Sequence, residues 1–71
     1  MTITEVANLH GVKQYIPSAG HTITDIIRIL YNSEEDLYYQ ILTTLNHRTD
    51  WLNLSPDVPI YYLAIPHIKK L

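Results

Sequence analysis

The chain has 71 residues, no cysteine, and seven acidic against five basic side chains, which gives a formal net charge of −2. A chain of this length forms one domain and buries only about 60% of its unfolded surface, so its core is thin. Without cysteine the chain has no disulfides or thiolate metal sites, and the acidic balance argues against a nucleic-acid partner.

The first eleven residues are predicted to lie outside the main domain. Residues 2–9 alternate weakly between polar and apolar side chains, which indicates either a strand or an extended arm, and the pattern leaves both open. Gly11 then ends the segment. The start lacks the basic and apolar regions of a signal peptide, and no apolar run reaches the about 18 residues of a membrane span.

Residues 12–17 are predicted to form the first strand. Val12, Gln14 and Ile16 alternate with Lys13 and Tyr15, and tyrosine and isoleucine suit a half-buried pleated surface. Proline cannot donate to a strand ladder, so residue 17 ends the strand. A turn over residues 18–20 follows.

Two helices are then predicted in close succession. Thr22 and Asp25 form a capping-box pattern at the start of the first, which runs to Asn32. Ser33 is the predicted start of the second, with three acidic residues in its first turn, and Asn46 is its predicted end. The apolar stripes recur at helical spacing and consist of Ile23, Ile26, Ile27 and Leu30 in the first helix, and Leu37, Ile41, Leu42 and Leu45 in the second.

The remaining residues are predicted to form a loop, a strand and a tail. Residues 47–57 carry strong turn chemistry at their end, residues 58–65 are apolar nearly throughout, and Pro66 ends that strand. Trp51 and its leucine neighbours make the loop apolar, which is consistent either with closing the core or with a partner contact. Residues 67–71 are predicted to be a tail.

The order of strand, helix, helix and strand predicts an α+β fold. Two strands alone make a marginal sheet, so the two helices are expected to pack on one face of a two-stranded antiparallel sheet, with the N-terminal extended arm outside it.

The same stretch, residues 12–66, resembles the LysM family. Gly20-His21-Thr22-Ile23 stands where the family has Gly-Asp-Thr-Leu, the second helix ends in asparagine as in the family, and residues 53–57 resemble the family's Asn-Leu-x-Pro-Gly. Two departures are His21 in place of aspartate and Asp57 in place of glycine.

The resemblance implies one of two roles. Short, free-standing members are similar to phage tail protein X and to LysM-like baseplate proteins of contractile tails, which join hub, tube and wedge proteins. Such a protein is made in the host cytoplasm and ends in the virion. Other members bind glycans that contain N-acetylglucosamine. By family analogy, the partner or glycan groove would be flanked by Gly20, His21, Thr22, Ile23, Asn46, Pro56 and Asp57.

Aromatic residues support a protein interface. The chain has six tyrosines and one tryptophan but no phenylalanine. Neighbouring strand residues point to opposite faces, so Tyr61 and Tyr62 cannot both face the helices, and Tyr39 is expected to face away from its helix stripe. Tyrosine and tryptophan are enriched at protein interfaces. The candidate interface residues are Tyr39, Trp51, Tyr61, Tyr62 and Ile3.

Neither catalysis nor a cofactor is expected. No pair among the four histidines has the helical spacing of a zinc site, and the acidic residues are explained as helix starts and turns. The leading hypothesis is therefore a connector protein of a phage tail baseplate or related injection machine. A peptidoglycan-binding module is the first alternative, and a small regulatory protein-binding protein is the second.

Overall fold

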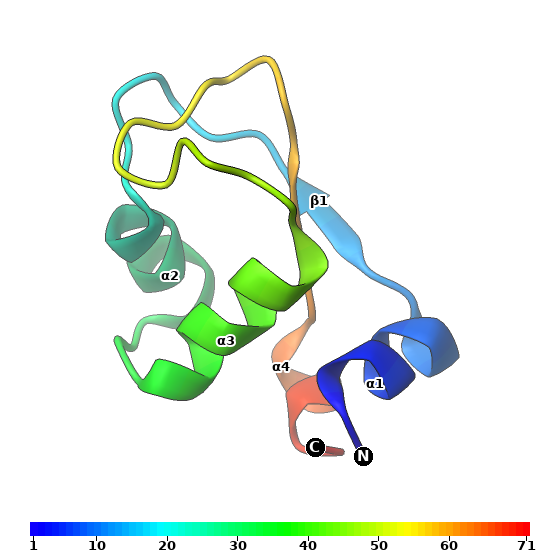
Figure 1. Cartoon of the computed structure of the whole chain (residues 1–71). Helices are drawn as coiled ribbons and strands as arrows, with labels where there is room; N and C mark the ends of the chain where they lie inside the picture. Colours follow the sequence, from blue (N-terminus) through cyan, green and yellow to red (C-terminus); the bar gives the residue numbers. More distant parts are fainter.

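The sheet is built from two short strands that are far apart in the sequence. The computed structural model describes all residues 1–71, and Figure 1 shows its helices and strands. The elements in chain order are α1 (Ile3–His10), β1 (Lys13–Tyr15), α2 (Ile23–Tyr31), α3 (Asp36–Leu45), β2 (Ile60–Tyr62) and α4 (Ile65–Ile68).

The two strands pair antiparallel, as predicted. Lys13 lies opposite Tyr62, Gln14 opposite Tyr61, and Tyr15 opposite Ile60. Both strands are shorter than the predicted ranges 12–17 and 58–65.

The helices lie on the inner face of this sheet. Ile60 is fully buried there, α3 packs against β2, and Tyr62 meets the α2 residue Tyr31 edge to face with ring centroids 6.4 Å apart. The predicted α+β class and the β-α-α-β order are therefore confirmed.

The N-terminal segment is a helix, so the expectation of a strand or an extended arm was wrong. The Thr2 hydroxyl accepts from the Glu5 N–H at 3.1 Å, and the Glu5 carboxylate accepts from the Thr2 N–H at 3.3 Å, which is a complete capping box. Val6 is fully buried, and Ile3 and Ala7 pack beside it. These three residues have the three- and four-residue spacing of a helix face.

The start and end of α2 follow the predicted signals. The Thr22 N–H donates to the Asp25 carboxylate at 2.9 Å, and this bond holds the pKa of the Asp25 carboxyl below its usual value. Asn32 ends the helix in the left-handed conformation, at φ 53°. Ile26 and Ile27 are fully buried.

Helix α3 begins later than predicted. The Ser33 hydroxyl accepts from the Glu35 N–H at 3.4 Å and so forms a local turn, whereas Glu35 is the N-cap and caps without a side-chain hydrogen bond. Asn46 ends the helix as predicted, and its N–H donates to the Leu42 carbonyl at 3.1 Å.

The C-terminal residues, predicted to be a tail, pack onto the fold. Ile68 in the short helix α4 is buried, and α4 contacts α1. The rings of His10 and His67 stack between the two helices, with centroids 4.4 Å apart and planes 6° from parallel. Figure 1 shows this joining of the two ends of the chain.

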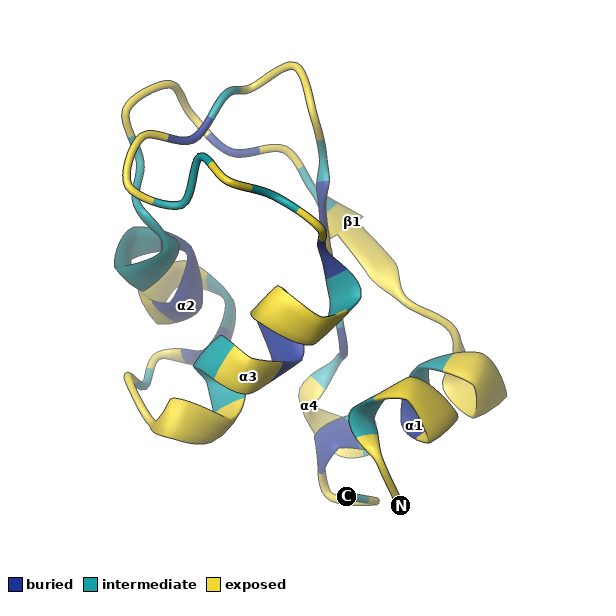
Figure 2. Cartoon of the chain, viewed as in Figure 1, coloured by how far each residue is buried: buried dark blue, intermediate teal, exposed yellow.

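The hydrophobic core draws on α1, α2, α3, β2, α4 and two connecting segments. Figure 2 shows its buried residues on the inward sides of the helices. The core consists of Val6, Ile26, Ile27, Tyr31, Ile41, Leu42, Leu54, Ile60, Leu63 and Ile68.

Candidate functional site

Two loops lie side by side at the end of the molecule away from α1 and α4 (Figure 1). The Leu54 N–H donates to the His21 carbonyl at 2.7 Å, the Gly20 N–H donates to the Leu54 carbonyl at 3.4 Å, and the Ile23 N–H donates to the Trp51 carbonyl at 2.8 Å. Residues 20–23 and 51–54 are therefore held together by their backbones.

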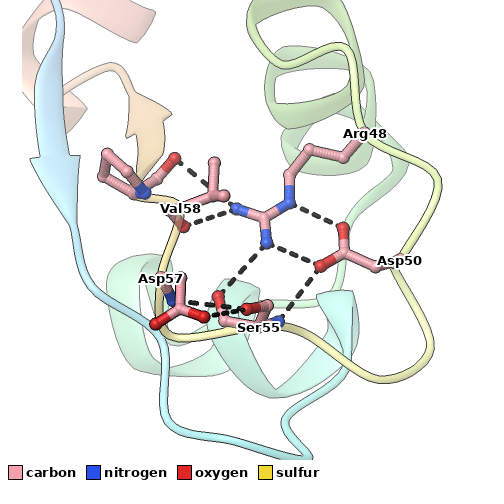
Figure 3. Close-up of polar contacts among 6 residues, drawn as sticks. Arg48, Asp50, Ser55, Asp57 and Val58 are labelled. Carbon is pink, nitrogen blue, oxygen red and sulfur yellow. Dashed lines mark hydrogen bonds and ion pairs between the residues drawn. The ribbon is translucent and has the colours of Figure 1, made fainter.

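Arg48 organises the second of these loops, as Figure 3 shows. Its guanidinium donates two hydrogen bonds to the Asp50 carboxylate, at 2.8 and 2.7 Å, and others to the carbonyls of Val58 at 2.7 Å, Pro59 at 3.5 Å and Ser55 at 3.4 Å. Every nitrogen of the side chain is engaged. Because the Arg48 side chain is only 6% exposed, this charge must stay paired.

Asp50 completes this network. Its carboxylate also accepts from the Ser55 N–H at 3.0 Å. The hydrogen bonds from Arg48, and then the one from the Ser55 backbone, hold the pKa of the Asp50 carboxyl far below its usual range. The bond to Asp50 in turn raises the pKa of the Arg48 guanidinium. The sequence analysis missed this network, because Arg48 and Asp50 are bonded to backbone groups of the loop that no spacing rule connects to them.

Most of the predicted groove residues fall on these two loops. Gly20 is exposed with φ 86°, a conformation that favours glycine, and His21 and Ile23 are half-buried. Pro56 and Asp57 are exposed in the adjoining loop. Backbone hydrogen bonds of residues 20–23 thus go to residues 51 and 54, and Asp57 bonds to Ser55 in the adjoining loop. Thr22 is half-buried, and its hydroxyl is used in capping α2.

Asn46 belongs to the interior and not to an exposed groove. Its side-chain amide donates to the Leu42 carbonyl at 2.8 Å and to the Tyr61 carbonyl at 2.9 Å, and its oxygen accepts from the Tyr61 N–H at 2.8 Å. Only 6% of the residue is exposed. Its side chain is thus committed to joining the end of α3 to β2, which corrects its assignment as a residue that flanks a groove.

His21 has a polar atom without a partner. Its Nδ1 is buried and makes no hydrogen bond, and it is the only such side-chain atom in the protein. Buried polar atoms are nearly always paired, so this nitrogen at the junction of the two loops is an exception that calls for an explanation.

The predicted interface residues differ in how far their side chains are exposed to solvent. Tyr39, expected to face away from the core, packs against it, and its hydroxyl lies 2.9 Å from that of Thr24. Ile3, Trp51 and Tyr62 are also partly buried against the core.

Tyr61 belongs to the outer face of the sheet. It is 37% exposed and lies opposite the exposed Gln14. Val12 and Ile16 are 41% and 58% exposed, and alternation along the strand places them on the face of Gln14. We call Val12, Ile16 and Tyr61 the outer sheet patch.

The structure has no pocket and no group of three or more side chains that could hold a metal ion. None of its helices is long and apolar enough to cross a membrane. Comparison of the chain with protein families, characterised proteins and solved structures finds no match.

Proposed function

We propose that this chain is a non-catalytic connector protein of a phage tail baseplate or a related contractile injection machine, where it docks to hub, tube or wedge proteins. The observation that carries the proposal is the outer sheet patch. Three exposed apolar side chains belong to this patch, with Tyr61 on β2 and Val12 and Ile16 directly before and after β1, whereas the helices cover the other face of the sheet. Contiguous apolar patches on a domain surface mark protein-binding sites.

The size of the chain supports the same role. A domain of 71 residues has a thin core, so burying an outer sheet face against a neighbour would add to its stability. The choice of a tail machine, and so of the virion as its location, rests on the resemblance to short LysM-like tail proteins.

The test is incorporation into tail particles encoded by the same genome. Mass spectrometry of purified particles should find the chain in fixed stoichiometry with the hub or wedge proteins. Tyr61→Lys should abolish incorporation because it places a charge in the patch, whereas Thr43→Lys on the exposed side of α3 should not. Particles that lack the wild-type chain would contradict the proposal.

A peptidoglycan-binding module is the second candidate, and one specific feature favours it. The loops 20–23 and 51–54 meet where the family analogy puts the glycan groove, and the unpartnered Nδ1 of His21 lies at that junction. A sugar hydroxyl is a suitable partner for such a nitrogen, provided that the imidazole turns outward on binding.

Retention on insoluble peptidoglycan tests this second candidate. Specific binding would be competed by soluble N-acetylglucosamine oligomers and weakened by His21→Ala but not by His47→Ala, which removes an exposed histidine. Binding with those properties would favour the wall-binding function over the connector. Absence of retention would eliminate it.

A further inference from the structure

The two edges of the sheet differ. In an antiparallel pair, each residue directs both its N–H and its C=O either toward the partner strand or away from it. Tyr61 directs both groups to the side chain of Asn46, at 2.8 and 2.9 Å. Asn46 therefore closes the outer edge of β2 as a short third strand would.

The outer edge of β1 is open. Because the backbone N–H and C=O of Tyr61 point away from β1, those of the opposite residue Gln14 point away from β2. Alternation along an extended chain gives the backbone groups of Val12 and Ile16 the same outward direction. No hydrogen bond joins the backbone groups of Val12 or Ile16 to any other part of the chain. Figure 2 shows β1 exposed along most of its length, and in Figure 1 no segment lies beyond it.

We propose that this open edge pairs with the same edge of a second copy of the chain. The two β1 strands would run antiparallel about a two-fold axis at Gln14. Gln14 would then pair with Gln14 of the partner subunit, and Val12 with Ile16 of the partner subunit. Each such pair exchanges two backbone hydrogen bonds, and the two sheets become one sheet of four strands.

The edge is self-complementary in this register, which is why a second copy fits it. A two-fold axis pairs the strand with an identical strand that runs in the opposite direction. Each side chain must therefore be compatible with the side chain of the same strand that lies opposite it. Val12 meets the partner's Ile16, an apolar pair, on both sides of the axis. Lys13, the only charge on the strand, meets the partner's Tyr15 and not another lysine. No like charges face each other in this register, so charge repulsion does not oppose it.

Pro17 is compatible with the pairing. It lacks an N–H, but it follows Lys13 and Tyr15 in the alternation, and the backbone groups of those residues face β2. The missing N–H would therefore have pointed toward β2 and not outward. It limits the length of the new ladder without removing a donor from it. A ladder this short forms a small interface, for which a dissociation constant of about 0.1–1 mM is expected.

This inference goes beyond the proposed function, because it concerns only copies of this chain. It stands or falls independently of any tail partner or glycan.

Analytical ultracentrifugation over about 20 μM to 2 mM is the first test, a range that brackets the expected dissociation constant. The wild-type chain should pass from monomer to dimer. Gln14→Pro removes one outward N–H and leaves the ladder with β2 intact, so it should remain monomeric. Gln14→Thr, which keeps the N–H, should still dimerise. A wild-type chain that is monomeric throughout, or a proline variant that dimerises equally well, would overturn the proposal.

Paired charge variants test the register and do not depend on the proline variant folding. Val12→Glu with Ile16→Lys puts opposite charges across both outer pairs, whereas Val12→Lys with Ile16→Lys puts like charges there. The first should associate at least about tenfold more tightly than the second. Equal affinities would overturn this register.

Cysteine cross-linking gives a direct readout, because the chain has no cysteine of its own. Gln14→Cys lies on the proposed axis and should oxidise to a disulfide-linked dimer, since residues in such a pair have Cα atoms about 5.5 Å apart. Lys13→Cys lies off the axis and should cross-link much more slowly. The reverse order would contradict the pairing.

Discussion

At the residue scale, Tyr31 combines burial with a defined hydrogen bond. Its hydroxyl donates to the Leu63 carbonyl at 3.0 Å, and its ring stacks on that of Tyr38 with centroids 4.5 Å apart. Burial is the main cause that raises the pKa of Tyr31 to about 12. The side chain thus links α2 to the segment after β2 only while it is protonated.

Replacing Tyr31 tests this link. Tyr31→Phe leaves the Leu63 carbonyl unpaired, so we expect a loss of about 1–2 kcal/mol in the free energy of unfolding, measured with urea. Tyr61→Phe, whose hydroxyl makes no hydrogen bond, should change it by less than about 0.5 kcal/mol. Equal effects of the two substitutions would contradict the role of the buried bond.

The same group predicts alkaline behaviour. The folded pKa of Tyr31 lies above the unfolded value of about 10, so its contribution is complete below that pH and is lost as the pH rises through about 12. In an ultraviolet titration, one of the six tyrosines should ionise last, and Tyr31→Phe should remove that step.

Asp50 predicts behaviour at acid pH. Its folded pKa lies below the unfolded value of about 3.9, so its stabilising effect is complete above that value and is lost as the pH falls below it. We expect Asp50→Asn to lower the melting temperature by at least about 5 °C at pH 7, because it leaves the buried Arg48 charge without its counter-charge.

The acid dependence provides the control. Asp50→Asn should also flatten the fall in melting temperature between about pH 4 and 2, because the group that titrates there is gone. Asp57→Asn, an exposed change in the same loop, should leave both properties close to wild type. If both variants keep the wild-type pH profile, the Arg48–Asp50 pair does not determine acid stability.

At the element scale, Asn46 couples a helix to a strand, and its substitution tests that coupling. Asn46→Asp removes the donors that face the Leu42 and Tyr61 carbonyls, so we expect a loss of about 2–4 kcal/mol in the free energy of unfolding. Asn53→Asp is the matched exposed control. Chemical denaturation measures both, and a tolerated Asn46→Asp would show that the edge of β2 needs no closure.

What the sequence predicts at this scale depends on how local each cause is. The start of α2 was predictable because Thr22 and Asp25 contact each other within one turn. The start of α1 carries the same pattern in Thr2 and Glu5, and the weak alternation around it hid the helical spacing of Ile3, Val6 and Ala7. A capping box therefore predicts where a helix begins, provided that it is given more weight than a weak polar–apolar alternation.

The loops and Asn46 show where such prediction stops. Backbone hydrogen bonds hold residues 20–23 beside the loop that follows Arg48. Arg48, however, also reaches the carbonyls of Val58 and Pro59, ten and eleven residues away, and Asn46 reaches the backbone of Tyr61, fifteen residues away. One-dimensional spacing does not encode these bonds. Asn46 accordingly resembled a groove residue in the sequence and is an interior link in the structure.

At the scale of the whole molecule, the predicted domain boundaries can be tested directly. Residues 1–11 and 67–71 were expected to lie outside a domain of residues 12–66, but Val6 and Ile68 belong to the ten-residue core. A small domain has a marginal net stability, and each fully buried aliphatic side chain contributes about 1.5–3 kcal/mol.

We therefore expect a chain of residues 12–66 to lack a cooperative thermal transition, because it loses two buried side chains and uncovers the core beneath α1 and α4. In the full chain, Val6→Ala should cost about 2 kcal/mol, whereas Leu9→Ala on the same helix, where leucine is 65% exposed, should cost less than about 0.5 kcal/mol. Circular dichroism during heating measures all three. A shortened chain that melts as sharply as the full one, with Val6→Ala as mild as Leu9→Ala, would restore the view of the N-terminal segment as a dispensable arm. The opposite result would make α1 and α4 part of the folding unit, so that any partner must dock on a fold that both ends of the chain complete.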